Sequence, residues 1–212
     1  MTKNILSIDI HPDYIVCAIY NKQKNLSDFI KINKNEFIKT ILYFENQNVI
    51  IGEEKANTII YNDFISCLLN NTRKTYPINF LGSDYEMNDF CLLYFYFNEI
   101  MKLTKEKGEI SDIIISIPDH FFNQQEEIKK NLYLTFKKIG YSNICIIPRS
   151  VSYLGFVAVL DKIKKDQQNY IIFEVEHQLI SIISGWVKNK ENQKVIFVEK
   201  QKQFKKENKE GI

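Results

Sequence analysis

Glycine and proline are scarce in this chain, with seven glycines and four prolines among 212 residues. Neither of the common glycine-rich phosphate-binding sequences, GxxxxGK(S/T) or GxGxxG, occurs anywhere in it. No apolar run approaches the ~20 residues that a membrane-spanning helix needs, and the N-terminus lacks the apolar stretch of a signal peptide. The sequence therefore predicts a cytoplasmic protein without a membrane span.

A surplus of charge of one sign is also missing. The 28 basic and 26 acidic residues give a net charge of +2, which provides no electrostatic basis for binding nucleic acid or an acidic membrane surface. The four cysteines are widely spaced, and no pair of them has the spacing of metal ligands. We expect them to be reduced thiols, as is usual in a cytosolic protein.

The clearest pattern is a strand–helix–strand–helix unit between Ser111 and Lys162. Residues 112–117 and 143–147 are apolar runs that predict buried parallel strands. Between them, apolar residues at helical spacing from Gln124 to Ile139 predict a crossover helix. This unit predicts an α/β domain with a right-handed crossover.

The rest of the chain is predicted to be mixed. Residues 90–97 are apolar all round, so the long helix expected from Met87 to Lys107 should be a buried core helix. Residues 70–84 are expected to form a loop. The remaining expected strands lie at residues 4–9, 14–20, 29–32, 41–44, 49–51, 170–175, 179–187 and 195–199.

The order and spacing of these elements resemble the first lobe of the ATPase domain of DnaK-type seventy-kilodalton heat-shock chaperones. In that family a strand ending in Val-Pro leads through an aromatic turn into a helix, as residues 117–125 do here. The family's Asn-Glu-Pro and Tyr-Gly-Leu-Asp-Lys segments match residues 146–150 and 159–162. Its opening Ile-Asp-Leu-Gly-Thr-Thr strand and its Ile-Gly-Asp-Ala-Ala-Lys segment match residues 7–17 and 42–55.

The resemblance spans about residues 4 to 199 and implies an actin-like ATPase, ribonuclease-H-like α/β fold. It predicts a complete first-lobe-like domain over residues 1–162 and a partial second-lobe-like β segment over residues 163–199. Residues 200–212 have mixed charge and no apolar periodicity, which predicts a disordered tail. The helices that cover the second lobe in the family have no counterpart in the sequence.

The resemblance also implies where nucleotide would bind, and there the sequence departs from the family. Two glycine-containing turns grip the phosphates of ATP in that family, because a missing Cβ lets backbone N–H groups approach the oxygens. The positions implied here are Asp9, His11, Pro12 and Asp13 in the first turn, and Glu174, Glu176 and His177 in the second. Glycine is absent from both, so ATP and Mg²⁺ are implied by resemblance only, and no cofactor, metal or catalytic residue is expected.

Two further charged positions have a counterpart in the family's nucleotide-sensing relay. An arginine after Val-Pro and the glutamate of Asn-Glu-Pro correspond to Glu126, after Pro118, and to Arg149, with the charges exchanged. These two side chains are either a retained ion pair or two unrelated surface charges. In the same way, His11 and His177 with the nearby carboxylates are either metal ligands or solvated turn residues.

The predicted function is that of a chaperone-like protein with degenerate phosphate loops, acting as a nucleotide-independent interaction or scaffold subunit. The alternatives are an ATP-binding chaperone or co-chaperone with weak ATPase activity, or a sugar or acetate kinase of the same superfamily. Strands over residues 170–199 have apolar side chains on both faces but lack covering helices. We therefore expect this segment to bind a protein partner or its own copy.

Overall fold

The structure is a computed structural model that describes residues 4–80, 82–124, 126–159, 167–175, 179–190 and 193–205. Contacts divide the chain into two compact units. The N-terminal unit contains Met1–Ile117 and Phe121–Ile146, and the C-terminal unit contains Pro118–His120 and Ile147–Ile212. These units differ in extent from the predicted domains, residues 1–162 and 163–199, because α5 (Arg149–Val159) groups with the C-terminal strands.

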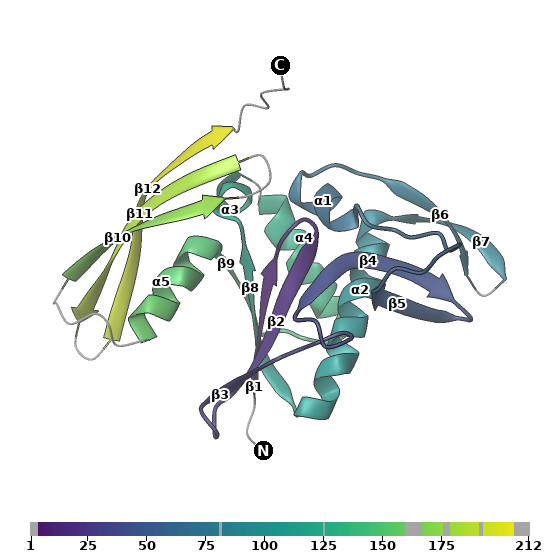
Figure 1. Cartoon of the computed structure of the whole chain (residues 1–212), viewed down its shortest axis with the longest axis horizontal. Helices are drawn as coiled ribbons and strands as arrows, with labels where there is room; N and C mark the ends of the chain where they lie inside the picture. Colours follow the sequence, from purple (N-terminus) through teal and green to yellow (C-terminus); the bar gives the residue numbers. More distant parts are fainter. Residues whose placement is uncertain are drawn as a thin grey trace. The chain divides into compact units, whose positions relative to one another are not determined.

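The N-terminal unit is built on a mixed seven-stranded sheet with the order β5-β4-β2-β1-β8-β9, and β3 pairs with β2 (Figure 1). Strands β1, β2, β4 and β5 pair antiparallel in that order, whereas β1 and β8 pair parallel. The predicted α/β class is thereby confirmed. The strand bounds are β1 Asn4–Ile10, β2 Tyr14–Asn21, β3 Leu26–Phe29, β4 Phe37–Glu45, β5 Asn48–Gly52, β8 Ile110–Ile117 and β9 Ile144–Pro148.

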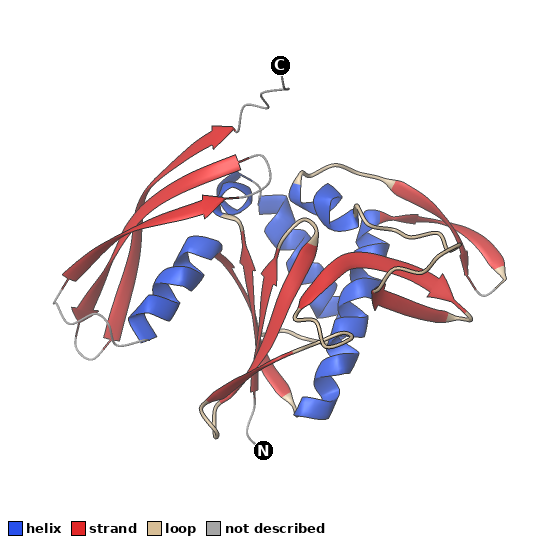
Figure 2. Ribbon diagram, in the orientation of Figure 1, coloured by secondary structure: helices blue, strands red, loops and turns tan. Residues whose placement is uncertain are grey.

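The helices of this unit are α1 (Phe64–Leu69), α2 (Asp89–Thr104) with its 3-10 extension η1 (Lys105–Lys107), and α4 (Glu126–Ile139). α3 (Asp119–Gln124) precedes α4 (Figure 2). Helix α2 is a core helix as predicted, and the side chain of Asn88 caps its first turn by accepting from the Cys91 N–H at 3.0 Å. Phe97 of α2 packs on Phe136 of α4, with ring centroids 4.9 Å apart.

Residues 70–84 are not the predicted loop. They contain β6 (Thr75–Phe80), which forms a hairpin with β7 (Ser83–Asn88). Tyr76 and Ile78 of β6 are buried while the residues between and beside them are exposed, which is the alternation of a half-buried strand. The pattern is only three residues long, so it is easily read as a loop from sequence.

The two strands of the predicted parallel unit differ in burial. Ile113, Ile115 and Ile117 of β8 are buried, but β9 is an edge strand whose Cys145 is exposed. The prediction that both strands are covered on both faces is therefore wrong for β9. An edge strand has a neighbour on one side only, so fewer atoms cover its side chains.

This difference makes a prediction about the thiols. Cys17 lies in the core, where burial and then the charge of Asp9 raise the pKa of its thiol far above the ordinary value, whereas Cys145 is exposed. Because the thiolate is the reactive form, we expect iodoacetamide to modify Cys145 in the folded protein and Cys17 only after unfolding. Peptide mass spectrometry at short labelling times measures both. Equal labelling of the two in native buffer would contradict the burial of β2.

The C-terminal unit is a three-stranded antiparallel sheet with α5 on one face (Figure 1). Its strands are β10 (Gln167–Val175), β11 (Leu179–Lys190) and β12 (Gln193–Lys205). Leu154 of α5 packs with Val187 in a small core that also involves Tyr170, Ile172 and Ile196. A Cβ added at Gly185 would lie 2.6 Å from the backbone oxygen of Phe197, so only glycine allows this approach.

Two predictions for this unit need correction. One face of the sheet is covered by α5, whose Leu154 packs against Val187 of β11. The tail predicted to be disordered from residue 200 begins instead as the end of β12, where Phe204 pairs with Ile180. Hydrogen bonding to β11 orders residues 200–205 without the apolar periodicity that the prediction required. Residues 206–212 lie outside the described residues. None of the helices that the structure describes is long and apolar enough to cross a lipid bilayer.

Candidate functional site

The first implied phosphate turn joins β1 to β2 and is closed by its own backbone. The His11 N–H donates to the Tyr14 carbonyl at 2.9 Å. The buried Thr40 of β4 donates its hydroxyl to the Pro12 carbonyl at 2.7 Å and its N–H to the Asp13 carbonyl at 3.0 Å. Since Pro12 has no N–H, two of the donors that a phosphate would need are missing or occupied.

The side chains of this turn also disfavour an anion. His11 Nε2 lies 3.0 Å from Asp9 Oδ2, and its ring stacks on Tyr14 with centroids 4.2 Å apart. Phe37 meets Tyr14 edge-on at 5.3 Å. Asp13 adds a carboxylate, and two like unit charges 4 Å apart repel by about 4 kcal/mol at an effective dielectric of ~20. The turn is therefore an acidic and aromatic surface.

The second implied turn lies partly outside the described residues, since it includes Glu176 and His177. Glu174, at the end of β10, is described and is almost fully buried. Its Oε1 accepts from Arg149 Nη1 at 2.6 Å, and the Arg149 side chain is only 1% exposed. Two residues that the sequence placed in different sites thus form one buried ion pair.

Glu126 and Arg149, left open as an ion pair or as two unrelated surface charges, each pair with another residue. The Glu126 side chain is 90% exposed and pairs with Lys129, one helical turn further along α4. Arg149 pairs instead with Glu174 in the C-terminal unit. Pro118, the third residue of the implied relay, is buried directly after β8.

A second buried contact lies next to this ion pair in sequence. Asp119 Oδ1 accepts from the Ser150 N–H at 2.8 Å, and its Oδ2 accepts from the Ser150 hydroxyl. Ser150 is the second residue of α5, so the carboxylate caps the first turn of that helix, where negative charge is favourable. We call Asp119, Arg149, Ser150 and Glu174 the buried polar network.

Sequence reasoning missed Asp119 and Ser150. The available signal was that Pro118 and Pro148 each end an apolar run and are followed at once by a charged residue. Both hydrogen-bonding oxygens of Asp119 face Ser150, and both residues are buried. The Asp119–Ser150 contact connects residues 118–120 with α5, and the Arg149–Glu174 ion pair connects α5 with β10.

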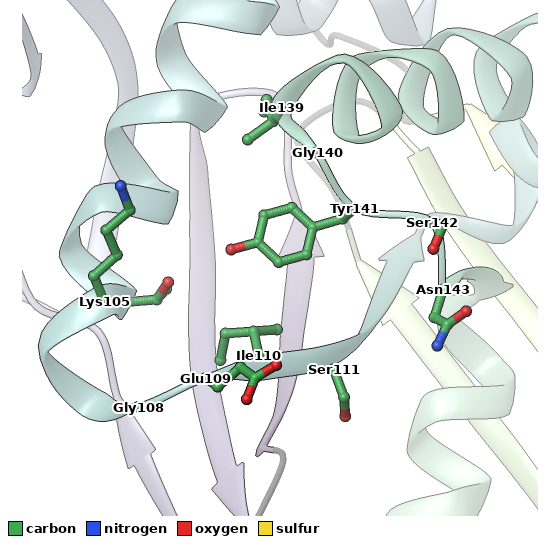
Figure 3. A pocket seen from close by; sticks show the side chains of 11 residues that line it. Lys105, Gly108, Glu109, Ile110, Ser111, Ile139, Gly140, Tyr141, Ser142 and Asn143 are labelled. Atoms are coloured by element: carbon green, nitrogen blue, oxygen red, sulfur yellow. The ribbon is translucent and has the colours of Figure 1, made fainter. Parts of the chain in front are cut away.

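A pocket of about 680 Å³ opens in the N-terminal unit between the ends of η1 and α4 and the start of β8 (Figure 3). Gly108 and Gly140 turn the chain there with φ of 112° and 116°. The Tyr141 ring extends into the space between Lys105 and Ile110. Burial raises the pKa of the Tyr141 phenol, which keeps it protonated as a hydrogen-bond donor.

The position of this pocket separates it from the implied nucleotide turns. Asn4 at the start of β1 pairs with Ile110 at the start of the parallel strand β8. The pocket therefore lies at the amino end of these two strands, whereas the His11–Tyr14 turn follows the carboxyl end of β1. Ligands of open α/β sheets bind at carboxyl ends, so the pocket does not replace the phosphate site.

Neither a protein-family model nor a curated protein matches this chain. The likeness to DnaK-type ATPase domains therefore stays a prediction from element order and spacing.

The sequence left His11 and the carboxylates of the first turn open as metal ligands or solvated turn residues. Among the residues that the structure describes, no group of three or more His, Cys, Asp or Glu side chains is placed to hold a metal ion. Asp9, His11 and Asp13 belong to the searched residues. The two further candidates, Glu176 and His177, are not among them.

Proposed function

We propose that this protein is a nucleotide-independent interaction or scaffold protein with an actin-like ATPase, ribonuclease-H-like fold, related in form to the ATPase domain of DnaK-type chaperones. The fold is supported by the antiparallel strands β1, β2 and β4 beside the parallel pair β1–β8. Loss of nucleotide binding is supported by the closed His11–Tyr14 turn and by the use of Glu174 in a buried ion pair.

The observation that carries the proposal is the outer face of the C-terminal sheet, the face opposite α5. Ile171 and Phe173 of β10 are 66% and 65% exposed, and Phe204 of β12 is 50% exposed. Trp186 stacks on Phe197 on the same face, with ring centroids 3.8 Å apart. Burying one such side chain stabilises by about 1.5–3 kcal/mol, so a face that exposes several of them favours binding to another apolar surface.

The composition of the outer face fits a protein partner. Aromatic side chains are enriched at the centre of protein–protein interfaces, and charged residues surround that centre. Here Trp186, Phe197 and Phe204 lie on the face, while Lys188 and Lys202 are exposed beside them. The patch is apolar rather than strongly basic, as a site for nucleic acid would be.

Association tests this proposal directly. We expect the mass of the purified protein to rise above the 25.1 kDa of one chain as its concentration increases. Because the contact is apolar, the association should persist at 1 M NaCl. At that salt concentration the Debye length is ~3 Å, so attraction between surface charges is screened. Multi-angle light scattering at low salt and at 1 M NaCl measures the mass. A monomer at every concentration would contradict the proposed role of the outer face.

Titration with Mg-ATP tests the nucleotide half of the proposal. We expect no binding tighter than about 100 μM, a free energy near −5.5 kcal/mol, because in the first turn the His11 N–H is occupied, Pro12 has no N–H and two carboxylates are present. Isothermal titration calorimetry measures the constant, with Asp9→Ala as the matched control for any ATPase activity. A micromolar constant, or turnover above that of Asp9→Ala, would favour the ATP-binding chaperone instead.

A further inference from the structure

The two edges of the C-terminal sheet differ in their protection against pairing. Natural edge strands avoid uncontrolled pairing by carrying lysine or proline. β12 has four lysines, whereas β10 has no Lys, Arg or Pro over residues 167–175. The one charged residue of β10, Glu174, is neutralised by Arg149 on the helix side of the sheet.

The unprotected edge is also the more apolar one. Residues 170–173 read Tyr-Ile-Ile-Phe, and within the described part of the chain β10 pairs only with β11. Its outward main-chain groups pair with no other strand among the described residues. If a further strand pairs there, its alternating side chains would lie beside Ile171 and Phe173. An incoming strand with the same sequence as β10 would match it in both hydrogen bonding and polarity.

We propose that β10 pairs antiparallel with β10 of a second copy of this chain, about a two-fold axis at Ile172. This inference rests on the proposed function and names its partner. In this register Ile171 of each copy lies opposite Phe173 of the other, which gives two equivalent pairs. Such aromatic–β-branched pairs stabilise antiparallel strands. An axis at Ile171 would instead set Phe173 opposite Asn169, which replaces the two apolar pairs with a single Ile171–Ile171 pair.

The pairing extends the proposed interaction surface. Two three-stranded sheets become one six-stranded sheet, and the two outer faces become continuous. The contact is isologous, so it closes at two copies and does not propagate into a fibre. An edge contact of this length lies at the small end of interface sizes, so the dimer is expected to be weak and to form reversibly.

A pair of matched variants separates the edge from the face. Ile171→Glu places a charge in the apolar pair that Ile171 forms with Phe173 of the second copy. Phe204→Glu places the same charge on the same outer face, but on the other edge strand, β12. Both residues are exposed, so neither change disturbs the core. In analytical ultracentrifugation we expect Ile171→Glu to raise the dimer dissociation constant by about tenfold or more, equal to about 1.4 kcal/mol, and Phe204→Glu to leave it unchanged.

A double variant tests the register itself. In Ile171→Glu with Phe173→Lys, the new carboxylate of one copy faces the new ammonium of the other, twice. We expect this double variant to dimerise better than Ile171→Glu alone at low salt, and to lose that gain at high salt. Absence of any rescue would overturn the axis at Ile172.

The wild-type chain provides a measurement that needs no substitution. Hydrogen exchange of the amides over residues 170–174 should slow as the protein concentration rises, while exchange over residues 196–204 should not change. If Ile171→Glu leaves association unchanged, or Phe204→Glu abolishes it, the edge inference is wrong. Loss with Phe204→Glu would place the contact on the outer face instead. If the chain never associates, both the edge inference and the proposed function are wrong.

Discussion

Arg149→Met is expected to destabilise the C-terminal unit by about 3–5 kcal/mol, the usual cost of leaving a buried charge without its partner. The side chains of Arg149 and Glu174 are 1% and 5% exposed, and their charged atoms lie 2.6 Å apart. Removing the guanidinium leaves the carboxylate in a site that water does not reach. Urea denaturation followed by the fluorescence of Trp186, the only tryptophan and a residue of β11, reports on this unit.

A second variant separates the buried charge from lost packing. Arg149→Met combined with Glu174→Leu removes both charges and keeps apolar volume, and such replacements are often neutral or stabilising. We expect the double variant to recover most of the lost stability. Glu126→Gln, which removes a charge from an exposed pair, is the matched control and should unfold like the parent. A midpoint for Arg149→Met equal to that of the parent would show that the pair does not support the unit.

Phe136→Ala is expected to cost the N-terminal unit about 3–5 kcal/mol, because it opens a cavity where α4 meets α2. Phe136 is fully buried and its ring lies 4.9 Å from that of Phe97. Tyr133→Ala on the same helix is the control, since Tyr133 is 38% exposed and its loss leaves no closed cavity. Thermal melting followed by far-ultraviolet circular dichroism measures both. A Phe136→Ala melt that matches the parent would mean that the packing of α4 is wrongly assigned.

The elements with long apolar patterns were predictable from the sequence. Ile128, Leu132 and Phe136 recur at helical spacing and are all buried on α4. The three C-terminal strands also formed the expected sheet. By contrast, only Tyr76 and Ile78 are fully buried in β6, and two residues do not establish a period. The exposure of Cys145 depends on which strand ends the sheet, which is a property of topology and not of local sequence.

The buried polar network could not be predicted for a different reason. Glu174 and Arg149 are 25 residues apart, and Asp119 and Ser150 are 31 apart. Periodicity and spacing describe neighbours along the chain, whereas these pairs form only when distant segments meet. The family resemblance assigned Glu174 to a phosphate turn and Arg149 to a relay. Each assignment named a plausible charged position, but neither identified the partner.

The contact between Asp119 and Ser150 has a consequence for how this architecture can be inherited. The chain enters the C-terminal unit at Pro118–His120, returns to the N-terminal unit, and enters again at Ile147. The acceptor that caps α5 is therefore encoded well before the helix that it caps. A gene segment that begins at Ile147 would carry the sheet and the helix without this cap, and loss of a cap costs about 0.5–2 kcal/mol. The C-terminal unit is therefore not encoded as one continuous stretch of sequence.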